Sequence, residues 1–103
     1  MKRRYLLAPQ AARDLVQIWR YIKRESSEQT ADRVESVIRS KFAYLADFPG
    51  GGHLRRDLTA ADVRFLSVYS YLIVYRPETK PLQIVAILHA YRDVAKILPK
   101  RVG

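Results

Sequence analysis

Two one-sided apolar stripes in the first half of the chain place the strongest constraint on its fold. Within residues 10–25 apolar side chains recur three and four positions apart, and mostly polar side chains fill the positions between them. The first stripe consists of Leu15, Ile18, Trp19 and Ile22. This spacing puts the apolar residues on one face of an α-helix, so we predict a helix from about Gln10 to Glu25.

A second stripe follows after a short polar link. Ser26 and the Gln three positions later form a plausible capping box, which marks the start of a new helix. The apolar positions of this stripe are Ala31, Val34, Val37, Ile38, Phe42 and Leu45. The pattern ends near Asp47, before Pro49. Because the link is short and both stripes are one-sided, we predict an antiparallel helical hairpin that needs a further layer to cover it.

The second half of the chain supplies that layer. Residues 63–68, 69–76 and 82–89 are rich in β-branched and aromatic side chains, with a Pro-containing turn at 77–81. These runs are almost continuously apolar, which predicts strands covered on both faces. A short strand at residues 5–7 and a helical turn within 91–98 complete the prediction. The whole chain, 1–103, is then one α+β domain in which the helical hairpin packs on an antiparallel β-meander.

Charge narrows the classes of partner. The chain carries 19 Lys and Arg against 10 Asp and Glu, a formal net charge of +9. Both halves contribute to the surplus, so it belongs to the folded domain and not to a tail. Such a surface favours either nucleic acid or an acidic protein partner. The chain has no cysteine, which excludes a disulfide framework and a thiolate metal site.

Familiar catalytic and cofactor motifs are missing from the sequence. Gly50–Gly52 is not followed by the Lys-Ser/Thr of a phosphate loop and is predicted to be a flexible connector. His53 and His89 lie far apart without an acidic pattern that would indicate a metal, so we expect neither metal nor cofactor. The apolar stretch before Pro9 is too short for a signal peptide, and no run approaches a membrane span. We therefore expect a cytoplasmic protein without membrane contact.

Polar side chains gather where the predicted strands begin and end. They are Arg64, Tyr75, Arg76, His89, Tyr91, Arg92 and Asp93. His89 could donate or accept a proton, arginine could hold a phosphate, and tyrosine could stack on a base. In the alternative interpretation, Arg92 and Asp93 form a local ion pair and His89 only satisfies a backbone group. In a meander, not all of these side chains can share one edge of the sheet.

Several segments, taken in order, carry a family resemblance. They are residues 5–15, Ile18-Trp19, Phe48-Pro49, residues 56–58, Val63-Arg64, residues 71–76, residues 87–89 and Arg92-Asp93. Together they resemble the ParE branch of the ParE/RelE superfamily, the toxins of bacterial type II toxin–antitoxin pairs. The resemblance covers nearly the whole chain and implies the same hairpin-on-meander fold. It also implies a toxin that poisons DNA gyrase by binding, without catalysis of its own.

The His-x-x-Arg-Asp ending favours this branch. Carried onto this chain, the target-binding residues would be Arg64, His89, Arg92 and Asp93. Two alternatives stay open. A RelE-like ribosome-dependent mRNA endoribonuclease would use Arg64, Arg76, His89 and Tyr91 as catalytic residues. A nontoxic basic nucleic-acid-binding domain would need none of them in a catalytic role.

The resemblance further implies a cognate antitoxin, usually ParD-like, that forms a hetero-oligomer with the toxin. We expect that partner to be acidic and partly disordered when alone. The helical hairpin offers apolar and basic positions to such a partner. The residues predicted to contact it are Arg13, Trp19, Arg20, Arg33 and Arg39.

Overall fold

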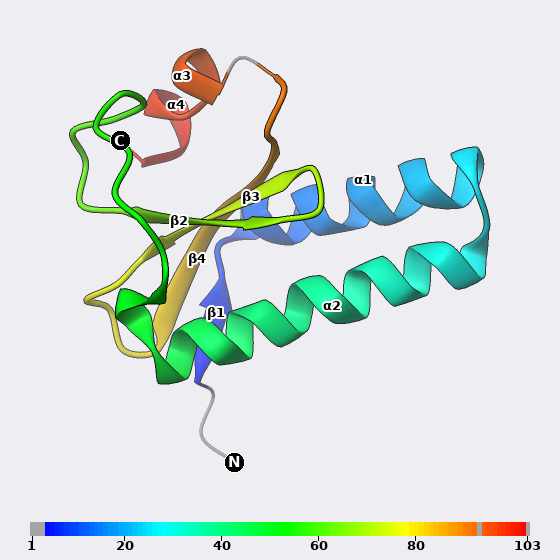
Figure 1. Cartoon of the computed structure of the whole chain (residues 1–103), viewed down its shortest axis with the longest axis horizontal. Coiled ribbons are helices and arrows are strands. Elements are labelled where there is room, and N and C mark those ends of the chain that lie inside the picture. Colours follow the sequence, from blue (N-terminus) through cyan, green and yellow to red (C-terminus); the bar gives the residue numbers. More distant parts are fainter. Residues whose placement is uncertain (1–3, 93, 103) are drawn as a thin grey trace.

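The computed structural model describes residues 4–92 and 94–102, and its elements follow one another in the predicted order (Figure 1). The elements are β1 (Tyr5–Leu7), α1 (Pro9–Glu25), α2 (Glu28–Asp47), the 3₁₀ turn η1 (Pro49–Gly51), β2 (Arg64–Val68), β3 (Tyr71–Arg76), β4 (Leu82–His89), α3 (Val94–Ile97) and α4 (Pro99–Val102). The predicted α+β fold is therefore confirmed, with the C-terminal helical turn split into two short helices.

The two long helices begin and end at recognisable signals. Pro9 occupies the first turn of α1, where its missing N–H costs no hydrogen bond. The N-cap of α2 is Ser27, whose hydroxyl accepts the Thr30 N–H at 3.0 Å. The predicted cap at Ser26 is thus wrong by one residue. The Thr30 hydroxyl, and not the expected Gln side chain, accepts a hydrogen bond from the Ser27 hydroxyl at 2.9 Å.

In the part of the chain that the structure describes, no helix combines the length and apolarity needed to cross a membrane.

The sheet has the strand order β1-β4-β3-β2. Strands β2, β3 and β4 form the predicted antiparallel meander, with a bulge between Val74 and Tyr75. Strand β1 pairs with β4 in parallel, from Tyr5 opposite Leu82 to Leu7 opposite Ile84, which makes the sheet mixed. The long connection that such a parallel pairing requires contains the helical hairpin and strands β2 and β3.

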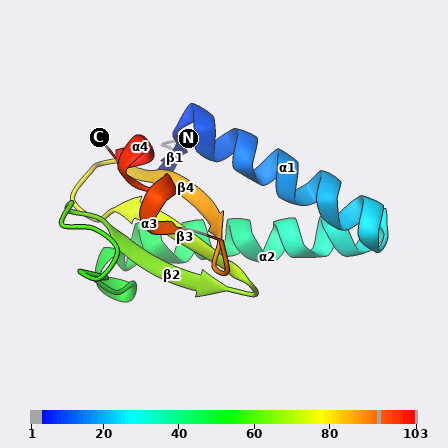
Figure 2. The same ribbon diagram turned by 90° about the horizontal axis from the view of Figure 1, so that it is seen from above.

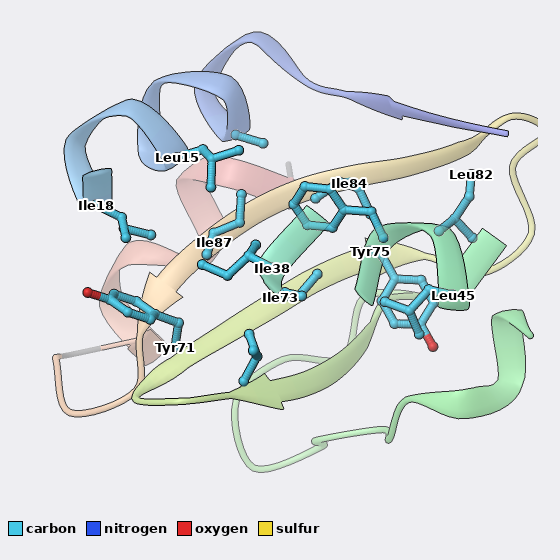
Figure 3. Close-up of a cluster of buried hydrophobic side chains, with 13 residues drawn as sticks. Leu15, Ile18, Ile38, Leu45, Tyr71, Ile73, Tyr75, Leu82, Ile84 and Ile87 are labelled. Atoms are coloured by element: carbon cyan, nitrogen blue, oxygen red, sulfur yellow. The ribbon is translucent and has the colours of Figure 1, made fainter. Parts of the chain in front are cut away.

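Both faces of the sheet are covered, as the sequence predicts. On one face the hairpin packs against the strands, and Figure 3 shows Leu15 and Ile18 of α1 meeting Ile87 of β4 in this cluster. On the other face Val94 of α3 and Leu98, which lies between α3 and α4, belong to a second cluster. Strand β3 is consequently buried from Tyr71 to Tyr75.

The turn between α1 and α2 lies well beyond the sheet, so the far ends of both helices project from the body of the molecule (Figures 1 and 2). The near end of α1 instead passes beside β4 and the C-terminal segment. This arrangement brings the sheet end that carries His89 close to the middle of α1.

Candidate functional site

A groove of about 400 Å³ lies between α1, the end of β4 and the C-terminal segment. It is lined by Asp14, Gln17, Ile18, Tyr21, Tyr71, Ile87, Leu88, His89, Tyr91, Arg92, Ile97 and Arg101. Three of the residues singled out by their place at strand ends, His89, Tyr91 and Arg92, therefore share one site. Helix α1 contributes Asp14, Gln17 and Tyr21 to the groove, and none of these residues was predicted from the sequence to belong to a functional site.

Aromatic rings form one side of the groove. The His89 ring lies 5.5 Å from the Tyr71 ring in an edge arrangement and 5.6 Å from the Tyr91 ring. Tyr91 is 84% exposed, whereas Tyr71 is buried. The Tyr91 N–H donates to Nδ1 of His89 at 3.2 Å, which orients the imidazole. The three rings thus run from the core to solvent, where Tyr91 is largely exposed.

Tyr21 and Arg92 approach these rings from α1 and from the segment after β4. Burial raises the pKa of the Tyr71 hydroxyl, the nearby Tyr21 adds to that rise, and the charge of Arg92 acts in the opposite direction. The guanidinium of Arg24 lies 5.6 Å from the centre of the Tyr21 ring. Tyr21 and Arg92 thus line the groove together with Tyr71, and Arg24 lies next to it on α1.

Asp14 forms the inner wall of the groove and holds three segments together. Its Oδ2 accepts a hydrogen bond from the backbone N–H of Ile87 at 3.0 Å. Its two carboxylate oxygens also accept hydrogen bonds from Nη1 and Nη2 of Arg101. Because β1 ends at Leu7, opposite Ile84, the N–H of Ile87 has no strand partner on that edge of β4. The side chain of Asp14 takes the place of the missing strand.

Asp14 was not among the predicted site residues. One signal could have found it: Asp14 lies three residues after Ala11 and four before Ile18, so it occupies a position in register with the apolar stripe. A lone carboxylate at a position spaced like the core needs a partner, because unpaired buried charge is costly. Arg101 is that partner, 87 residues further along the chain.

Arg64 and Arg76 lie at the other end of the sheet. Arg64 pairs in register with Tyr75, whereas His89 pairs with Tyr71. Four residues of strand separate these positions, a distance of about 13 Å along β3. The structure thus does not bring together the four residues that a nuclease would need.

Each of these two arginines already has acceptors. Nη1 of Arg64 donates to the Gly52 carbonyl at 3.1 Å. Arg76 donates to the side chain of Gln83 at 3.1 Å and to the Val102 carbonyl at 3.2 Å. Of the predicted target-binding set, the groove contains His89 and Arg92 but not Arg64. Asp93 lies outside the described residues.

The predicted antitoxin contacts fall on the outer surface of the hairpin. Nε1 of Trp19 donates to Asp32 of α2 at 2.8 Å, and the Lys23 ammonium lies 5.3 Å from the centre of the indole ring. Trp19 thus bridges the two helices and is only half-buried. The four predicted arginines, Arg13, Arg20, Arg33 and Arg39, are exposed.

Arg13 and Arg20 have a closer relation to the groove than the other two. They lie four residues before and three residues after Gln17, so they are neighbours of a groove residue on the helix surface. Arg33 and Arg39 belong to α2, where Arg39 approaches Glu35 at 3.8 Å.

Among residues 4–92 and 94–102, no group of three or more metal-binding side chains occurs.

The fold of this small α+β domain is also found among solved structures. A solved structure with the same fold is described as a chromosomal ParDE toxin–antitoxin system from P. aeruginosa. The match has a TM-score of 0.72 and 21% sequence identity, and it covers 82% of this chain and 92% of that chain.

A match between the sequence and a protein-family model identifies the family. Residues 5–94 match the family described as the ParE toxin of the type II toxin–antitoxin system, parDE. The chain belongs to this family, which confirms the resemblance seen in its sequence. Comparison with curated proteins gave no match.

Proposed function

We propose that this protein is a toxin that inhibits DNA gyrase by binding to it and that a cognate acidic, ParD-like antitoxin neutralises it. The observation that carries the proposal is the family match, which spans residues 5–94 and includes the groove residues His89 and Arg92. We place target binding at these two residues. Arg92 is exposed and His89 is half-buried beside α1, so a large partner could contact both. The protein would act in the cytoplasm, where gyrase operates.

The arrangement of polar groups supports binding over RNA cleavage. A nuclease needs its proton-transfer group and its phosphate-binding cations within hydrogen-bond reach of one scissile bond. Arg64 and Arg76 lie about 13 Å and about 17 Å along the sheet from His89, and both donate to other acceptors. The test is the supercoiling reaction of purified gyrase, which this protein should inhibit and its antitoxin should restore.

We place the antitoxin along the hairpin, with Arg13 and Arg20 as charge partners beside the groove. The surplus of +9 favours an acidic partner, and no ion pair involving either arginine is found in the described residues. Arg33, Arg39 and the half-buried Trp19 would extend the contact across both helices. Exposed charges of this kind act mainly on the rate of association and its salt dependence.

Reversal of both charges should therefore slow capture by the antitoxin. For the double variant Arg13→Glu/Arg20→Glu we expect an association rate constant about tenfold lower at low salt, with a weaker dependence on ionic strength. Surface plasmon resonance with the immobilised antitoxin measures both. The matched control is Lys80→Glu, an exposed charge in the turn between β3 and β4. An equal loss of rate in the control would contradict this placement of the interface.

A further inference from the structure

The groove holds aromatic side chains besides His89 and Arg92. Tyr21, Tyr71 and Tyr91 all line it, together with the imidazole. Tyr21 is 50% exposed and Tyr91 is 84% exposed, although large aromatic side chains normally bury most of their area. The Arg24 guanidinium lies over the Tyr21 ring, whereas Tyr91 is the most exposed ring of the groove, so Tyr91 is the ring on which a ligand could stack.

Among the described residues, two arginines bring positive charge to these rings. Arg92 lines the groove, and Arg24 lies beside the Tyr21 ring. Within the described residues no carboxylate pairs with Arg92, and the one acidic side chain that lines the groove, Asp14, is already neutralised by Arg101. A ligand for this site therefore combines flat rings with negative charge.

The shape and polar groups of the groove fit one flat ring at a time. Its volume of about 400 Å³ is in the usual range for small-ligand sites. Gln17 brings an amide that can both donate to and accept from the edge of a base. A paired duplex could not place a base here, because its bases are stacked and hydrogen-bonded inside the helix. A single strand could.

From this geometry we propose that the groove binds a single-stranded polynucleotide, with one base stacked on Tyr91 and the adjoining phosphates held by Arg92 and Arg24. Aromatic side chains interleaved with cations are the usual construction of single-strand sites. The proposal goes beyond gyrase inhibition, since it assigns the toxin a nucleic-acid contact of its own. It does not depend on the identity of the protein target.

Fluorescence anisotropy of the purified protein with a labelled 15-nucleotide thymidine oligomer tests the proposal. We expect the thymidine oligomer to bind more tightly than an abasic oligomer of the same length. Tyr91→Ala should weaken its binding by about 5- to 150-fold, the loss for one stacked base. Tyr91→Phe retains the ring and should restore most of the affinity. The control Tyr44→Ala removes a tyrosine that is also exposed but lies on α2 outside the groove, and it should bind as the parent does.

Three results would overturn the proposal. They are equal binding of the thymidine and abasic oligomers, equal losses in Tyr91→Ala and Tyr44→Ala, and full displacement of the oligomer from the groove by poly-glutamate at equal charge. The last result would assign the groove to an acidic protein. A uridine oligomer in parallel shows whether DNA or RNA is the better ligand. Because neither gyrase nor antitoxin is present, a negative result leaves the proposed inhibition of gyrase untouched.

Discussion

Asp14→Ala is expected to lower the free energy of unfolding by about 3 kcal/mol, the lower end of the usual loss when one partner of a buried ion pair is removed. The side chains of Asp14 and Arg101 are only 15% and 13% exposed, so solvent can replace the lost contact only in part. The N–H of Ile87 would lose its acceptor as well. Nε of Arg101 is already buried without a hydrogen-bond partner, and the substitution would leave the guanidinium poorly satisfied.

Denaturant titration followed by circular dichroism measures this loss. The matched control is Arg39→Ala, which breaks the exposed pair with Glu35 on α2 and should cost about 0.3–0.5 kcal/mol. Asp14→Asn should fall between the two, because an amide oxygen can still accept the Ile87 N–H. Equal unfolding midpoints for Asp14→Ala and Arg39→Ala would show that Asp14 does not hold α1, β4 and α4 together.

Gly52→Ala should be similarly damaging. A Cβ at this position would lie 2.5 Å from the Tyr75 hydroxyl and 2.8 Å from the backbone oxygen of Phe65. That hydroxyl accepts the Gly52 N–H at 2.8 Å and donates to the Pro49 carbonyl at 2.6 Å. Overpacking and the loss of a buried hydrogen bond together should cost about 3 kcal/mol.

Gly50→Ala provides a control within the same glycine triplet. A Cβ at Gly50 would meet no atom within 4 Å, and no described glycine has a positive φ. The substitution should be neutral or stabilise the protein by up to about 1 kcal/mol, because alanine restricts the unfolded chain. Thermal unfolding of the two variants side by side tests the contrast. A Gly52→Ala protein as stable as Gly50→Ala would mean that the packing of Gly52 against Tyr75 is unimportant.

The different surroundings of these two glycines could not be predicted from the sequence. The triplet was predicted to be a flexible connector, and it does connect α2 to the region before β2. Gly51 and Gly52 nevertheless pack closely against Tyr44 and Tyr75. Such contacts depend on residues 7 and 23 positions away, and no local pattern reveals them.

Helices and strands were predictable because their signals are local. The apolar spacing around Leu15 and Phe42 fixed the hairpin, and the β-branched runs fixed the meander. The partner of β1 was not predictable, since a parallel pairing between Tyr5 and Leu82 spans most of the chain. The sheet was therefore expected to be antiparallel with a separate N-terminal strand, and it is mixed.

The candidate site was predictable in part. His89 and Arg92 were found because they end a strand, and both line the groove. Arg64 and Arg76 also mark strand ends, but they lie at the end of the strands opposite to His89. Gln17 and Tyr21 were missed because a polar residue and a tyrosine on a helix surface resemble an ordinary solvent-facing stripe.

The central claim is that this member of the ParE toxin family acts on gyrase by binding. The most direct measurement incubates the purified protein with gyrase, ATP and relaxed plasmid, and quantifies supercoiled DNA and DNA cleaved within the gyrase complex. We expect cleaved complexes to accumulate, Arg92→Ala to weaken the effect, and the antitoxin to abolish it. Unchanged supercoiling and cleavage, together with mRNA cut during translation in a parallel reaction, would contradict the claim and assign the protein to the nuclease alternative.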